Sequence, residues 1–64
     1  GPNYHVLDES GPDHSKVFLI AVMLGEQELG RGSGASKKEA QQAAAEDAMR
    51  LLGMHDQPGE IHGD

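Results

Sequence analysis

The chain has 64 residues, no cysteine and a formal net charge of -6 at pH 7. This length allows one small domain at most, and the lack of cysteine excludes disulfides and thiolate metal sites. The longest apolar run, Val17 to Leu24, is far shorter than the about 20 residues that a membrane-spanning helix needs. The acidic balance argues against nucleic-acid binding through overall charge, so any such site must be a local basic patch.

Three short strands are predicted in the first half of the chain. Their expected ranges are 4–9, 16–24 and 28–34, joined by a Gly-Pro loop over 10–15 and a tight connection over 25–27. In the first strand, Tyr4, Val6 and Asp8 are expected on one face. The third strand is weakened by its glycines, which places it at a sheet edge or at a bulge.

A helix is predicted from residue 37 to residue 52. Ser36 is a favourable N-cap, and Glu39 follows three residues later, as in a capping box. Gly53 fits the position just after the helix. Alanines recur at helical spacing along its length. The remaining polar segment, 53–64, is predicted to be a flexible C-terminal tail.

Together these elements predict an α+β fold, in which a three-stranded antiparallel sheet carries a C-terminal helix on one face. The sheet row expected to face the helix is Phe18, Ile20, Val22 and Leu24. A single helix with an alanine face covers little of the sheet, so the predicted core is small. The alternate row is also apolar, and Leu19 and Met23 are its large residues. This row is either a protein-contact surface or a set of ordinary exposed hydrophobic residues.

Two adjacent lysines, Lys37 and Lys38, occupy the predicted start of the helix. The helix dipole favours acidic side chains at this position and disfavours cations. Helix N-termini bind phosphate well, so the lysines suggest a site for a polyanion. The alternative is that both are solvated surface lysines.

Five short motifs occur in register along the chain. They are Pro2–Tyr4 (P-x-Y), Glu9–His14 (E-x-G-P-x-H), Lys16–Phe18 (K-x-F), Leu29–Gly34 (L-G-x-G-x-G) and Ser36–Ala45 (S-K-K-x-A-x-x-A-A-A). Together they resemble a double-stranded-RNA-binding domain, specifically the C-terminal one of bacterial ribonuclease III, and the expected domain is 1–52. The family fold is α-β-β-β-α, and its first helix has no counterpart in this chain. The family's last basic position in the final helix is Gln41 here.

The resemblance implies binding to double-stranded RNA by shape. The residues it implies for RNA binding are Pro12, His14, Lys16, Ser36, Lys37 and Lys38. The two adjacent lysines would contact phosphates across the major groove. The loop over 11–16 would enter a minor groove, with the proline carbonyl and the histidine side chain near 2′-hydroxyl groups. The serine would add a backbone contact, and the loop lysine would add local positive potential.

The chain itself shows no nucleophile or pocket for catalysis, and we expect it to have no metal or cofactor. The resemblance implies a parent ribonuclease III, an Mg²⁺-dependent endonuclease (a hydrolase) of RNA and rRNA processing, whose separate catalytic nuclease domain in the same polypeptide holds the metal. It further implies a cytoplasmic homodimer with no membrane partner. The alternative function is a protein-interaction module of the same fold that uses Leu19 and Met23.

Overall fold

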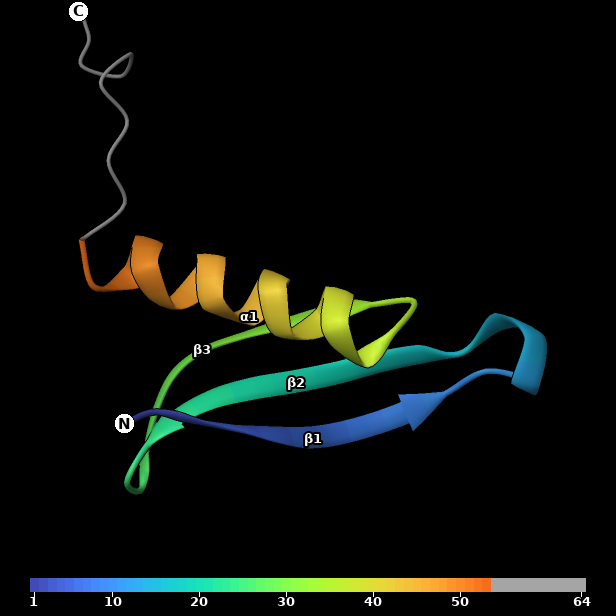
Figure 1. Cartoon of the computed structure of the whole chain (residues 1–64), viewed down its shortest axis with the longest axis horizontal. Coiled ribbons are helices and arrows are strands. Elements are labelled where there is room, and N and C mark those ends of the chain that lie inside the picture. The colour runs from blue at the N-terminus through green and yellow to red at the C-terminus, as the bar shows by residue number, and fades with distance from the viewer. Residues whose placement is uncertain (54–64) are drawn as a thin grey trace, which may run out of the picture.

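The computed structural model describes residues 1–53 as one sheet and one long helix (Figure 1). The elements are β1 (Asn3–Ser10), a short 3-10 helix η1 (Asp13–Ser15), β2 (Val17–Leu24), β3 (Gln27–Gly34) and α1 (Lys37–Leu51). The strands are antiparallel, in the order β1-β2-β3. The predicted α+β fold, without the family's first helix, is confirmed, and η1 is an addition that the sequence did not predict.

The division into a 1–52 domain and a 53–64 tail remains a prediction, because residues 54–64 lie outside the described part. Within residues 1–53, α1 is too short and too polar to cross a membrane.

The core lies between α1 and the sheet. Its buried residues are Ile20, Val22, Ala40, Ala44 and Ala48, with Phe18 and Leu29 packed at its margin. Leu24 was expected in the same row, but its exposed fraction is 51%. It lies two pairs beyond Val22, next to the turn, and is therefore past the last row that the helix covers.

Glycine lets α1 lie directly on the backbone of β3. Gly30, Gly32 and Gly34 alternate along the strand and all face the helix, because they pair with the helix-facing row of β2. A Cβ atom at Gly34 would lie 2.8 Å from the Ala40 nitrogen, and one at Gly32 would overlap the backbone at Ala44. The glycines of the L-G-x-G-x-G segment therefore set how closely the helix approaches the sheet.

Each outer strand contains a bulge. The pairing of β1 with β2 shifts at Leu7, and the pairing of β2 with β3 shifts at Leu29. The predicted bulged edge strand is thus confirmed for β3. The bulge in β1 corrects another prediction, because the extra residue turns Asp8 to the face opposite Val6, where it pairs with Leu19.

Local hydrogen bonds fix the start of α1. The Ser36 hydroxyl oxygen accepts from the Glu39 N–H at 3.1 Å, as predicted for an N-cap. The Glu39 carboxylate accepts in turn from the Ala35 N–H at 3.2 Å, one residue before the expected partner. At the other end Leu52 is the C-cap and Gly53 has a φ of 75°. The predicted caps are therefore present, and they hold the two lysines at the first helical positions.

Candidate nucleic-acid interface

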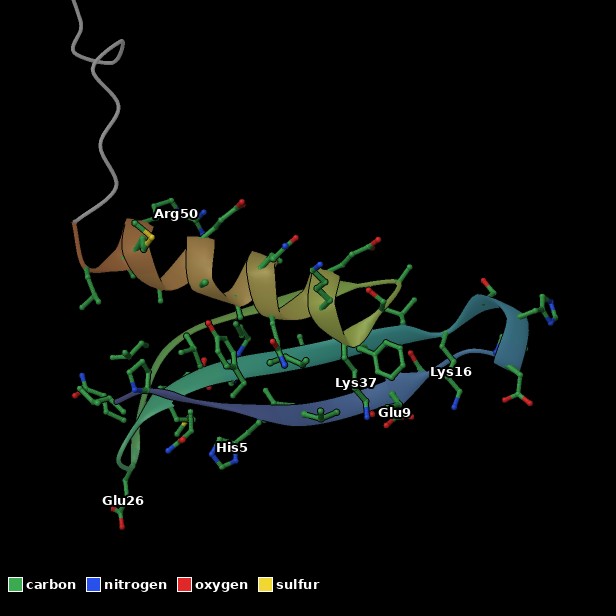
Figure 2. All side chains as sticks on the ribbon, viewed as in Figure 1. His5, Glu9, Lys16, Glu26, Lys37 and Arg50 are labelled. Atoms are coloured by element: carbon green, nitrogen blue, oxygen red, sulfur yellow. The ribbon has the colours of Figure 1, made fainter. Side chains whose placement is uncertain are left out.

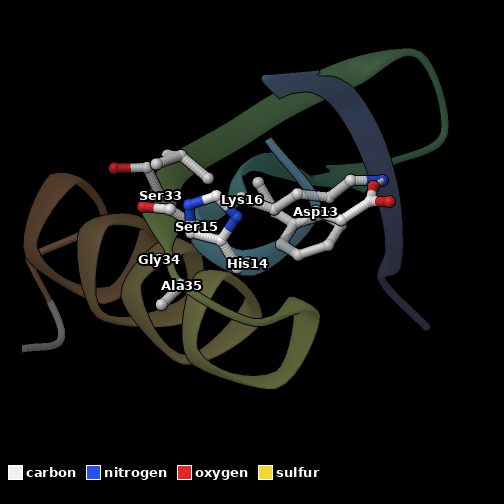
Figure 3. Close-up of a pocket in the computed structure, with 9 residues that line it drawn as sticks. Asp13, His14, Ser15, Lys16, Ser33, Gly34 and Ala35 are labelled. Atoms are coloured by element: carbon white, nitrogen blue, oxygen red, sulfur yellow. Dashed lines mark ion pairs between the residues drawn. The ribbon is translucent and has the colours of Figure 1, made fainter. Parts of the chain in front are cut away.

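The β1–β2 loop and the start of α1 meet at one end of the sheet. Phe18, near the start of β2, pairs with Gly34 at the end of β3, so the segment entering the helix lies beside the loop. An open groove of about 580 Å³ separates them (Figure 3). Its lining residues are Asp13, His14, Ser15, Lys16, Val17, Phe18, Ser33, Gly34 and Ala35. The fold therefore brings the two predicted RNA-binding segments together.

The loop has a defined shape. Gly11 has a φ of 92°, and a Cβ atom there would overlap the Ser15 carbonyl, so the turn requires glycine. The Pro12 carbonyl accepts from the Ser15 N–H at 2.8 Å. A carbonyl oxygen has two lone pairs, so this one keeps capacity for a second donor. His14 is exposed and lines the groove (Figure 3).

Lys16 is paired with two acids. Its Nζ lies 3.4 Å from the Glu9 carboxylate and 4.0 Å from that of Asp13. Sequence reasoning missed both pairs. The Asp13 pair has an i,i+3 spacing that could have signalled it, whereas the Glu9 pair depends on the register of β1 on β2. The positive potential expected at Lys16 is offset by its neighbours.

The two helix-start lysines have different surroundings. The Lys37 ammonium lies over the Phe18 ring, 5.9 Å from its centroid, within the range of a cation–π contact. Phe18, predicted only as a core residue, thus also supports a candidate binding side chain. Lys38 is exposed and has no ion pair with any residue of the 1–53 segment. Ser36 accepts a hydrogen bond within the cap, so its own proton remains available to a ligand.

The other cations are neutralised within the protein. Arg31 donates two hydrogen bonds of 2.8 Å to Glu28, and this bonding is the main reason that the pKa of Glu28 is lowered. Arg50 pairs with Asp47 on the preceding turn of the helix. All five basic residues lie within 1–53, so the positive charge that lacks an acidic partner there is concentrated at the start of α1.

The predicted protein-contact residues lie on the sheet face away from α1. Leu19 pairs with Asp8 and Met23 with Asn3, on the face opposite to the core row. Both are half-buried, and Ala21 between them is fully buried. Their role as a contact surface stays a prediction. In residues 1–53, no three His, Asp or Glu side chains gather as a metal site would require.

Comparison with known proteins identifies the family of the chain. The family described as "Double-stranded RNA binding motif" matches residues 1–52, so the chain belongs to that family. It is 71% identical over 48 residues to a Ribonuclease 3 from Protochlamydia amoebophila, covering 75% of this chain and 20% of that relative. It is 53% identical over 51 residues to the Ribonuclease 3 of Myxococcus xanthus, covering 80% and 20%. The predicted family resemblance is confirmed, and the chain spans about a fifth of the length of these curated relatives.

Proposed function

We propose that this chain binds double-stranded RNA at the end of the sheet where the β1–β2 loop meets α1. The observation that carries the proposal is the charge at the helix start, where Lys37 and Lys38 lack acidic partners among residues 1–53. They occupy the first two helical positions, whose N–H groups have no acceptor within the helix. The two lysine side chains, the free N–H groups and the helix dipole together form a site suited to phosphate.

In this proposal the two segments contact adjacent grooves of an A-form duplex. RNA of this form presents 2′-hydroxyl groups along a shallow minor groove, next to a major groove lined by phosphates. With the lysines on the phosphates, the loop reaches the neighbouring minor groove. There the Pro12 carbonyl accepts a hydrogen bond from a 2′-hydroxyl group. The His14 side chain also forms a hydrogen bond with a 2′-hydroxyl group. These contacts select RNA over DNA and depend little on base sequence.

For the whole protein, we propose a ribonuclease III in which this segment holds the substrate. The relatives carry the name Ribonuclease 3, and the matched segment is about a fifth of their length. Cleavage then belongs to a catalytic nuclease domain elsewhere in the same polypeptide. That domain would hold the Mg²⁺ ions of a cytoplasmic, homodimeric endonuclease acting in rRNA processing. The chain described here would contribute affinity and duplex selectivity.

The test is a titration against an RNA duplex of about 20 base pairs, longer than the roughly 16 that such domains span, and a DNA duplex of the same sequence, at low salt. We expect RNA-selective binding that falls by roughly 100-fold or more in Lys37→Glu/Lys38→Glu, because both phosphate contacts become repulsive. Arg50→Glu is the control, since Arg50 lies at the other end of the same helix (Figure 2). Its effect should be several-fold at most.

Three results would contradict the proposal. The first is equal affinity of the folded chain for the RNA and the DNA duplex. The second is unchanged RNA binding in the double lysine variant. The third is a folded chain that binds neither duplex, which would direct attention to Leu19 and Met23 and the protein-interaction alternative.

A further inference from the structure

An acidic side chain stands among the cations of the candidate interface. The bulge at Leu7 turns Glu9 to the side of the sheet that carries α1, where it pairs with Phe18 across the strands. Residues paired in this way have adjacent side chains on one face. The Phe18 ring also lies under the Lys37 ammonium. Glu9 therefore neighbours the ring on which one proposed phosphate-binding lysine rests.

Glu9 also holds the lysine of the loop. The Lys16 ammonium lies 3.4 Å from the Glu9 carboxylate, and the second acid, Asp13, is 4.0 Å away. Figure 2 shows Glu9, Lys16 and Lys37 at the same end of the sheet. Lys16 and its two acidic partners, Glu9 and Asp13, have a summed formal charge of -1. They lie at the place where an RNA phosphate would approach.

The pair of Glu9 and Lys16 is poorly placed to stabilise the fold. The exposed fractions of the two side chains are 42% and 37%, and ion pairs this exposed contribute little to stability. Such a pair opens readily, and a phosphate can then replace the carboxylate as the partner of the lysine. The carboxylate remains close by and repels that phosphate.

We propose that Glu9 competes with RNA phosphate for Lys16 and thereby limits the affinity of the interface. The inference rests on the proposed RNA binding and adds a residue that restrains it. In the unaltered chain, the internal pair uses the charge of Lys16, so the lysine adds little to RNA affinity. Removing the charge of Glu9 releases Lys16 to neutralise a phosphate.

The test is a double-variant cycle of Glu9→Gln and Lys16→Gln in the full chain, titrated with the RNA duplex over a series of salt concentrations. We expect Glu9→Gln to tighten binding about three- to ten-fold. It should also steepen the slope of log K against log salt by about one, the contribution of one more neutralised phosphate. Lys16→Gln alone should weaken binding by a few-fold at most, because it leaves the Glu9 and Asp13 carboxylates without their cation, and in the Glu9→Gln background it should abolish the gain.

Glu26→Gln is the matched control. It removes the same charge, but Glu26 lies in the β2–β3 turn at the opposite end of the sheet (Figure 2). Asp13→Asn should give a smaller gain than Glu9→Gln, because the Asp13 side chain is fully exposed and its carboxylate is farther from Lys16. Thermal melts of each variant establish that the fold is retained.

Three results would overturn the inference: no gain in Glu9→Gln, an equal gain in the Glu26→Gln control, or a gain that persists without Lys16. If the unaltered chain binds RNA and the Lys37→Glu/Lys38→Glu variant does not, these three results contradict the role of Glu9 and leave the proposed function intact. If the folded, unaltered chain does not bind RNA, the proposed function fails and this inference fails with it.

Discussion

The two outer strands of the sheet face the same helix with opposite kinds of residue. The central rows run from Val6 through Ile20 to Gly32, and from Tyr4 through Val22 to Gly30. At the β3 end of each row the helix backbone touches the strand, whereas all of β1 is exposed. In these rows α1 lies over β3, where the helix-facing residues are glycine, and away from β1, where they carry side chains.

This asymmetry also positions the interface. The glycines set the distance of α1 from β3, and the cap at Ser36 sets where the helix begins. The loop, by contrast, is attached to β1, which α1 leaves uncovered (Figure 1). The helix lysines therefore belong to the well-packed half of the molecule and the loop to the open half.

The largest expected effect is a difference in stability between substitutions at the β3 end and the β1 end of a single row. Gly32→Val would drive a side chain into the backbone of α1 at Ala44, and should cost about 3 kcal/mol or more, as severe overpacking does. Val6→Ala in the same row should cost less than about 1 kcal/mol, because Val6 is 46% exposed. Urea unfolding followed by circular dichroism measures both. Similar costs at the two ends of the row would show that α1 does not rest on β3.

A smaller effect concerns the free edge of β3. The Asp47 carboxylate accepts from the outward-facing Arg31 N–H at 3.0 Å and also pairs with Arg50. Asp47→Ala should lower the free energy of unfolding by about 1 kcal/mol, and should speed amide exchange at Arg31, whose N–H would lose its acceptor. Asp47→Asn, which keeps an acceptor oxygen, should retain most of the protection. Unchanged exchange at Arg31 in the alanine variant would contradict this role.

The smallest effect is a pH dependence on the outer face of β3. Hydrogen bonding from Arg31 lowers the pKa of Glu28 in the folded chain. The resulting stabilisation is present above the pKa of the unfolded state and is lost as pH falls through the folded pKa. The chain should therefore be slightly more stable than Glu28→Gln at pH 7, and this advantage should be smaller at about pH 3, below the ordinary pKa of glutamate. Melting curves at both values test this, and a constant difference would count against the pair.

The sequence predicted most of what depends on local chemistry. The helix start follows from Ser36 and Glu39, and the weak, bulged edge strand follows from its glycines. Two predictions that depend on more than local patterns were wrong: the burial of Leu24 and the face of the sheet taken by Asp8. The burial of Leu24 depends on where the helix ends over the sheet, and the face of Asp8 depends on the bulge at Leu7. The ion pair of Glu9 with Lys16 was missed for the second reason, since the bulge in β1 decides which face of the sheet Glu9 takes.

The bulge at Leu7 shifts the alternation of side chains along β1 by one residue. Side chains alternate between the two faces of a strand, so one extra residue exchanges the faces of all that follow. Without it, Asp8 would lie on the helix side and Glu9 would point away from the lysines. The acidic neighbour of the interface is thus specified by the number of residues in the strand as much as by their identity. Insertions and deletions in β1 can therefore change the charge of this surface without replacing any of its charged residues.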